Sequence, residues 1–289
     1  MRAAFFRRSA WAAAAVLTLT TLSACSGEST CKMPKGVRTC LTVEQVKDMD
    51  AVRAGGRALL ESPGLESEVL LTPPKNLLGG SPSPIPGTGR YRGDAAEAAV
   101  GGSLHMEFTE DGHTDAARYT GGHMYVRYWK AVDDRTGKPA WVARSQGQLD
   151  RRGDEWNVVA ERTRAANPLM TARLLAAFVP EPGSNGLTRS GPDGRQLHVE
   201  MSHLFMPKAS YEILEGAFPD HRPQEVEVDL RLDEQKRITW YEATMRLTHI
   251  SGTDVQVRVM HTFKPAAGPV TLGPPEGVLN PVTPSPTGS

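Results

Sequence analysis

The stretch EVEVDLRLDEQKRITWYEATMRLTHISGTDVQVRVMHTF, residues 225–263, decides the fold, because apolar and polar residues alternate along most of it. A period of two residues puts successive side chains on opposite faces of a β-strand. The stretch therefore predicts antiparallel strands at 226–232, 239–250 and 255–263, each with one buried and one solvated face. The apolar faces of the last two strands match only across a connection of odd length, which predicts a turn at 251–253.

The same alternation continues upstream and predicts a sheet of many strands. Leu104, Met106 and Phe108, for example, alternate with polar residues. Further strands are predicted at 68–71, 104–109, 115–120, 124–128, 139–146, 155–162 and 196–205, with a last edge strand at 269–272. Trp129 and Trp240 fall on the predicted outer faces, where they mark either a partner surface or the contact of a covering helix.

The first helix is predicted by the signals at its start. Thr42 and Gln45 have the spacing of a capping box, in which each side chain accepts a hydrogen bond from the other residue's backbone. The helix is predicted over 43–61. Two adjacent glycines, Gly55 and Gly56, weaken its middle.

Two more helices and one long loop follow from proline and asparagine. Asn167 precedes a proline and predicts the cap of a second helix, which Pro180 ends. A short third helix is predicted at 208–215. The segment 62–95 is rich in turn residues, and its proline-rich part at 81–87 predicts a loop.

The N-terminus resembles the signal peptide of a bacterial lipoprotein. Three arginines within the first eight residues precede a 13-residue apolar run at 10–22 that is uncharged and too short to span a bilayer. Leu-Ser-Ala-Cys at 22–25 fits the lipobox. This resemblance implies cleavage after residue 24 and lipidation of the Cys25 thiol, with a secreted protein lacking lipid as the alternative.

The mature chain is predicted to lie on the extracytoplasmic face of the cell membrane. A diacylglyceryl group on Cys25 supplies the two acyl chains that stable anchoring needs. Residues 25–40 then form a tether, and Cys31 and Cys40 either form a disulfide within it or remain free thiols. Loss of the three signal arginines leaves 30 basic against 33 acidic residues, which argues against a nucleic-acid partner.

Several short motifs together resemble the LolA-like half-barrel lipoproteins, specifically the LppX/LprAFG group of actinobacterial lipid-binding lipoproteins. They are Met124-Tyr125-Val126 followed by Trp129, Asn167-Pro168-Leu169, Gly194 before Leu197-His198-Val199, and the stretch 228–234. The resemblance implies an α+β fold: a strongly curved antiparallel sheet, or half-barrel, with helices covering its concave face. A single domain is then expected over 41–275, followed by a proline-rich disordered tail at 276–289.

In that family the curved sheet can leave an apolar cavity for acyl chains. Methionines and aromatic residues gather on the predicted inner faces, and methionine adapts to irregular apolar partners. The candidate cavity residues are Met106, Met124, Met201, Phe205, Tyr241, Met245, Val257 and Phe263. The alternative interpretation is that these side chains form an ordinary packed core.

The sequence contains no recognised catalytic constellation. It has no Gly-x-Ser-x-Gly elbow, no His-Glu-x-x-His helix and no Walker loop. The predicted hairpin places His261 opposite Ala243 and too far from His249 to share a metal, so a buried histidine bonded to backbone or hydroxyl is expected. No catalytic residue, metal or cofactor is therefore predicted, and the protein is not expected to be an enzyme.

Two functions agree with these features. The first is a membrane-anchored extracytoplasmic lipoprotein that binds or transfers a lipid, a glycolipid or another acylated hydrophobic ligand without catalysis. The alternative is a cell-surface interaction or signalling module with the same fold and a packed core, whose partner is an envelope protein.

Overall fold

The chain divides into a unit of Met1–Thr30 and a unit of Cys31–Ser289, and the second contains every described residue. The computed structural model describes residues 41–72, 83–93, 103–144, 155–180, 186–191, 193–204, 206–218 and 220–279. The predicted signal peptide at 1–24, the tether at 25–40, Cys25, Cys31, Cys40 and Phe205 lie outside these residues.

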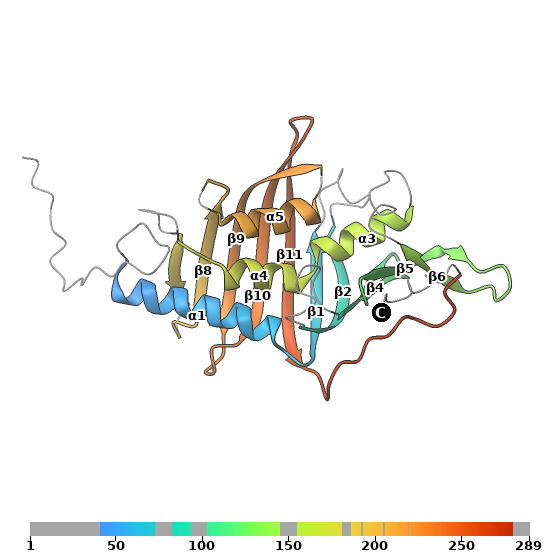
Figure 1. Cartoon of the computed structure of the whole chain (residues 1–289), viewed down its shortest axis with the longest axis horizontal. Helices are drawn as coiled ribbons and strands as arrows, with labels where there is room; N and C mark the ends of the chain where they lie inside the picture. Colours follow the sequence, from blue (N-terminus) through green and yellow to red (C-terminus); the bar gives the residue numbers. More distant parts are fainter. Residues whose placement is uncertain are drawn as a thin grey trace, which may run out of the picture. The chain divides into compact units, whose positions relative to one another are not determined.

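Eleven strands form one antiparallel sheet (Figure 1). They are β1 (Leu65–Thr72), β2 (Ile85–Arg92), β3 (Ser103–Glu110), β4 (His113–Thr120), β5 (His123–Val132), β6 (Pro139–Arg144), β7 (Leu187–Ser190), β8 (Gln196–Ser202), β9 (His221–Leu232), β10 (Ile238–His249) and β11 (Asp254–Pro265). The order is β6-β5-β4-β3-β2-β1-β11-β10-β9-β8-β7, so two meanders join where β1 pairs with β11. The described sheet is open, with β6 and β7 at its edges.

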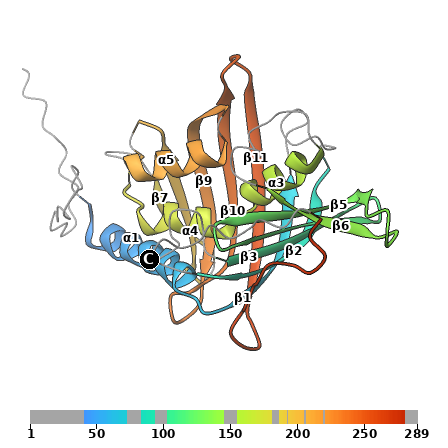
Figure 2. The ribbon, with the colours of Figure 1, turned by 45° about the vertical axis from the view of Figure 1, so that its right-hand side comes forward.

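Four helices among the described residues lie on one face of this sheet (Figures 1 and 2). They are α1 (Val43–Leu60), α3 (Glu155–Ala165), α4 (Pro168–Ala176) and α5 (Lys208–Ala217). α1 packs on α4 and reaches β7 and β10, α3 lies over β4 and β5, and α5 lies over β9. In Figure 2, β3 and β5 run across the direction of β9–β11, which shows how far the sheet turns. The fold is thus α+β with a curved antiparallel sheet, as predicted.

The β10–β11 hairpin confirms the predicted faces but corrects the register. Three residues, Ile250 to Gly252, form the turn, which is closed by a 2.8 Å bond from the His249 N–H to the Thr253 carbonyl. Gly252 has a φ of 89°, in the left-handed region that favours glycine. The turn begins one residue earlier than predicted, which places His261 opposite Tyr241. A slip of two residues keeps every side chain on its face, so the apolar pattern alone does not detect it.

The predicted loop at 81–87 is wrong in its second half, because Ile85 begins β2. Pro86 lies inside this strand, opposite Leu70 of β1. Pairing between β2 and β3 starts only at Gly87, so Pro86 has a neighbouring strand on one side alone. A proline that lacks an N–H is tolerated at such an edge position.

Residues 155–162 form part of helix α3 and not the predicted strand. Val159, Ala160 and Thr163 are all buried, and their spacing is that of one helical face. The short run Val-Val-Ala fits either element, because periodicity cannot separate a short buried strand from a buried helical turn. In the structure this segment is helical and contacts β4 and β5.

Two element boundaries also differ from those predicted, and one predicted strand is not formed. The strand predicted at 196–205 ends at Ser202, and His203 is exposed in the following turn. Helix α5 continues through Gly216 to Ala217. No strand forms at 269–272; Val270 is buried there and donates its N–H to the carbonyl of Pro63 at 3.2 Å.

Both predicted cap structures are confirmed. Thr42 and Gln45 form the capping box at the start of α1. The Asn167 side chain accepts a 3.0 Å hydrogen bond from the Leu169 N–H, with proline in the first turn of α4. Cap residues act through neighbours a few positions away, which is why the sequence alone places them well.

The C-terminal segment after β11 crosses to the other half of the sheet, where Figure 1 shows it reaching β6. The carbonyl of Leu272 accepts a 2.7 Å hydrogen bond from the Thr120 hydroxyl of β4. Leu279 donates its N–H to the carbonyl of Trp141 in β6 at 2.9 Å, and Val278 forms a bridge with Trp141. Contacts with the sheet therefore continue to residue 279, beyond the predicted boundary at 275.

Candidate functional site

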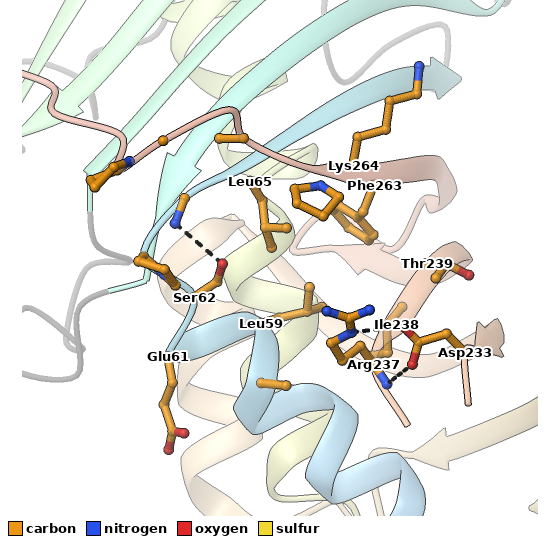
Figure 3. A pocket seen from close by; sticks show the side chains of 17 residues that line it. Leu59, Glu61, Ser62, Leu65, Asp233, Arg237, Ile238, Thr239, Phe263 and Lys264 are labelled. Carbon is orange, nitrogen blue, oxygen red and sulfur yellow. Dashed lines mark hydrogen bonds and ion pairs between the residues drawn. The ribbon is translucent and has the colours of Figure 1, made fainter. Parts of the chain in front are cut away.

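A pocket of about 590 Å³ lies where the end of α1 meets the β9–β10 turn and the end of β11 (Figure 3). Its apolar lining includes Leu59, Leu65, Ile238 and Phe263. Glu61, Asp233, Arg237 and Lys264 supply charged groups to the same lining. The pocket thus combines an apolar surface with charges of both signs.

The chain makes the walls of this pocket through a tight turn after α1. Glu61 caps the helix by donating its N–H to the carbonyls of Arg57 and Leu59. The following Ser62-Pro63-Gly64 stops the helix and starts β1. Ala266 then donates its N–H to the Gly64 carbonyl at 3.3 Å, which brings the C-terminal segment against the turn.

Three of the charged groups at the pocket, those of Asp233, Arg237 and Lys264, are paired. Asp233 accepts hydrogen bonds from the backbone N–H of Arg237 at 2.8 Å and from its Nε at 2.7 Å. Burial opposes ionisation of Asp233, but these bonds and the Arg237 charge outweigh it and hold the pKa of that carboxyl below its ordinary value. Lys264 pairs with Glu68 at 2.6 Å in full solvent, which lowers the pKa of Glu68 and raises that of Lys264.

The structure places seven of the eight predicted cavity residues in the hydrophobic core; the eighth, Phe205, lies outside the described residues. The side chains of Met106, Met124, Met201, Tyr241, Met245, Val257 and Phe263 are all buried. Only Phe263 of these seven lines the end pocket. The sequence therefore identified the inner face of the sheet, but the pocket lies at one end of that face.

Phe263 is also the centre of a buried aromatic cluster. The Phe263 ring lies 6.0 Å from the ring of Tyr91, 5.5 Å from that of Tyr241 and 5.5 Å from that of His261, measured between centroids. Tyr91, Tyr241 and His261 are all fully buried. One side chain thus contacts both the pocket and three polar aromatic residues behind it.

Burial shifts the pKa of each polar member of this cluster toward its neutral form. The pKa of Tyr91 is raised well above its usual value by burial and by the neighbouring Tyr241, and burial also raises that of Tyr241. Burial lowers the pKa of His261 to about 3, against a smaller opposite effect of its hydrogen bond to Ala166. The expectation that a buried histidine bonds to backbone is confirmed by this 2.8 Å contact from Nε2 to the Ala166 carbonyl.

Sequence reasoning missed Tyr91 and Thr171 as members of this region. Tyr91 lies in the segment predicted to be turn-rich. The signal in the sequence that could have indicated a strand there is the alternation of the charged Arg90, which is exposed, with Tyr91, which is buried. Thr171 lies on α4, where its hydroxyl approaches that of Tyr241 and opposes the rise in the Tyr241 pKa. The two hydroxyls nevertheless do not meet the geometry of a hydrogen bond.

The described part of the chain holds neither a metal-binding cluster nor a membrane-spanning helix. No group of three or more His, Cys, Asp or Glu residues in that part is placed to bind a metal ion. None of its helices is long and apolar enough to cross a membrane.

No model of a known protein family matches this sequence, and no curated protein matches it. Among solved structures, it is similar to one described as "GphF Dehydratase 1", with 15% identity over 82% of this chain and 88% of that one and a TM-score of 0.14. A dehydratase structure concerned with the borrelidin and fluvirucin polyketide synthases is 12% identical over 80% of this chain and 83% of that one, with a TM-score of 0.16. Likenesses at these scores carry no argument about fold or function.

Proposed function

We propose that this protein is a lipid-anchored, extracytoplasmic binding protein that holds or transfers an acylated hydrophobic ligand without chemical conversion. The observation that carries the proposal is the end pocket, whose apolar lining from α1, β1, β10 and β11 is bordered by charged side chains. Its volume of about 590 Å³ lies within the usual range for small-molecule sites. An acyl chain suits such a lining, because each buried CH₂ group contributes about 0.8 kcal/mol.

The membrane anchor is the second part of the proposal. The lipobox at 22–25 supports diacylation of Cys25 and attachment to the outer face of the cell membrane. The curved sheet with helices on one face supports a half-barrel of the LolA-like kind. A tether closed by a Cys31–Cys40 disulfide would stiffen the junction between the lipid and the domain.

The anchor is tested by metabolic labelling with radioactive palmitate in a bacterial host. We expect label on the wild-type protein and its recovery with membranes, and neither for Cys25→Ser, because the thiol is the acceptor of the lipid. A matched Cys31→Ser variant should keep the label. Equal labelling of the Cys25 variant would contradict lipidation at this residue.

Ligand binding is tested by solvent extraction and mass spectrometry of the exported, gently purified protein, with uptake of a fluorescent fatty acid as a second measurement. We expect a stoichiometric co-purified lipid. Ala58→Trp should sharply reduce both signals, because Ala58 lines the pocket and an indole there takes up part of its volume. Ala54→Trp is the matched control: Ala54 is exposed on the same helix, one turn earlier, and its substitution should leave uptake unchanged.

A ligand-free wild-type protein that also refuses the fluorescent fatty acid would overturn the binding function. That outcome would favour the interaction module, for which the opposite end of β9 and β10 offers a surface. Leu204 is 73% exposed after β8, and Ile250 is 66% exposed in the β10–β11 turn. Both therefore lie at the end of the sheet away from the pocket.

A further inference from the structure

The polar aromatic cluster behind Phe263 contains buried polar atoms that lack partners. The hydroxyls of Tyr91 and Tyr241, Nδ1 of His261 and the Thr171 hydroxyl are all buried without a hydrogen bond among the described residues. A buried polar group that makes no hydrogen bond costs about 1–3 kcal/mol. Four such atoms, on three adjacent aromatic side chains and the helix above them, leave hydrogen-bonding capacity that another group can use.

The tautomer of His261 determines what this cluster can accept. Its Nε2 lies 2.8 Å from the Ala166 carbonyl, which only accepts, so Nε2 carries the proton. With a pKa of about 3 the ring is neutral at pH 7, and Nδ1 is therefore an acceptor. The two phenols and the threonine hydroxyl can each donate or accept. The cluster thus needs a group that both donates and accepts a hydrogen bond.

The cluster is also uncharged. The pKa shifts of Tyr91, Tyr241 and His261 arise from burial and from neutral neighbours, with no charged side chain among their causes. An anionic carboxylate or phosphate placed there would lose its hydration without gaining a cation. An uncharged hydroxyl group meets the same donors and acceptors without that cost.

The cluster adjoins the pocket along the strands. Leu65, which lines the pocket, is the direct partner of Tyr91 across the β1–β2 ladder. His261 lies two residues from Phe263 on β11, and Tyr241 lies two residues from Thr239 on β10. Two residues of a strand span about 7 Å. Phe263 both lines the pocket and neighbours all three rings of the cluster, so it is the side chain that links the two.

We propose that Tyr91, Tyr241 and His261 form a polar subsite behind Phe263 that hydrogen-bonds an uncharged hydroxyl group at the end of an acyl or alkyl chain. The inference rests on the proposed function and narrows its ligand to hydroxyl-bearing lipids, such as fatty alcohols and acylglycerols, in preference to fatty-acid anions and phospholipids. In this arrangement the acyl or alkyl chain of the ligand lies in the end pocket, and the Phe263 ring turns aside to admit the head group. The hydroxyl donates to Nδ1 of His261 and accepts from a tyrosine.

The test measures binding of three probes of equal chain length to the full mature protein at pH 7: 1-dodecanol, its methyl ether and dodecanoate. The ether keeps an acceptor oxygen but cannot donate, and dodecanoate carries a charge. We expect dodecanol to bind about tenfold or more tightly than either, the difference that one buried hydrogen bond makes. In the double variant Tyr91→Phe/Tyr241→Phe, the affinities for dodecanol and for the ether should both fall, by about tenfold, because both oxygens accept from a phenol, while dodecanol keeps its advantage over the ether through Nδ1 of His261.

Stability without ligand provides an independent readout. Removing two unpartnered hydroxyls should leave the Tm of the double variant equal to or above that of the wild type, because their desolvation no longer opposes folding. Tyr128→Phe, on β5 and outside the subsite, is the control and should keep the wild-type affinity for dodecanol. A clear fall in the Tm of the double variant would show that the hydroxyls already have partners and would overturn the inference.

The outcomes separate this inference from the proposed function. Equal affinity for all three probes, or an affinity for dodecanol that is unchanged in the double variant, would overturn the hydroxyl subsite and leave lipid binding standing. Failure of all three probes, together with a ligand-free purified protein, would overturn both.

Discussion

At the scale of single residues, His261 is the group whose environment most changes its chemistry. The ring is fully buried between Tyr241 and Phe263 and donates to the Ala166 carbonyl at 2.8 Å. Burial lowers its pKa to about 3 from the ordinary 6.5. In the unfolded chain the ring takes up a proton below pH 6.5, whereas in the folded protein it remains neutral down to about pH 3. Its contribution to stability is therefore complete above pH 6.5 and is lost progressively as the pH falls toward 3.

This difference predicts a pH-dependent free energy of unfolding. Between pH 7 and pH 5, the histidine should remove about 2 kcal/mol of stability, because the unfolded state alone gains the proton. His261→Gln keeps a donor for the Ala166 carbonyl but does not titrate. The free energy of unfolding that this variant loses between pH 7 and pH 5 should therefore be smaller by that amount. Urea unfolding at the two pH values measures the difference, and His203→Gln, at an exposed histidine, should behave as the wild type. An identical pH dependence in His261→Gln and wild type would show that His261 does not cause this loss of stability.

At the scale of elements, the contact between α1 and α4 depends on Gly56. A Cβ at this position would lie 2.6 Å from the backbone nitrogen of Ala176 and 2.7 Å from the carbonyl oxygen of Ala172. Backbone atoms cannot turn aside as a flexible side chain does, so the two helices would have to separate. The glycines that weaken α1 by propensity thus allow its packing, and the helix runs unbroken from Val43 to Leu60.

Alanine substitutions at two helical glycines should therefore have opposite effects. Gly56→Ala should lower the free energy of unfolding by about 1–3 kcal/mol, because the clash exceeds the gain in helix propensity. Gly216→Ala in α5 should raise it by about 0.5–1 kcal/mol, because propensity improves. That position is exposed and a Cβ there meets no atom within 4 Å. Chemical denaturation of both variants measures the two changes, and a stabilised Gly56→Ala would show that the helices are not in close contact.

At the scale of the whole sheet, the C-terminal segment ties together regions distant in sequence. It lines the pocket through Ala266 and Pro269, bonds to β4 through the Leu272 carbonyl and reaches β6 through Leu279. Deleting residues 266–289 removes these contacts and one wall of the pocket. We expect a lower Tm and loss of fatty-acid uptake.

Deleting only residues 281–289 is the matched control for this truncation. It should leave Tm and uptake unchanged, because the described contacts of the segment end at Leu279. Thermal unfolding and the uptake measurement compare the two truncated proteins side by side. Full uptake by the longer deletion would show that the segment contributes nothing to the binding site.

Local signals predicted much of the fold and less of the site. The capping box at Thr42, the Asn167 cap and the alternation in β9–β11 all act over a few residues, and each prediction agrees with the structure. The same reasoning failed at 155–162, where a short apolar run fits two elements. Seven predicted cavity residues are buried as expected, but Leu59, Leu65 and Ile238 of the pocket were not identified, because apolar residues at element ends carry no distinctive pattern.

The sequence by itself determined the class of fold and the buried face of most strands, because capping and alternation are local patterns, while the lipid anchor at Cys25 stays a prediction from the lipobox. Only the tertiary structure decided the pairing of β1 with β11, the acceptance of Pro86 in a strand and the gathering of Tyr91, Tyr241 and His261 around Phe263. The first and the last of these features join residues that lie far apart in the chain. Which distant strands become neighbours depends on the burial gained by the whole sheet, and no local pattern carries that information.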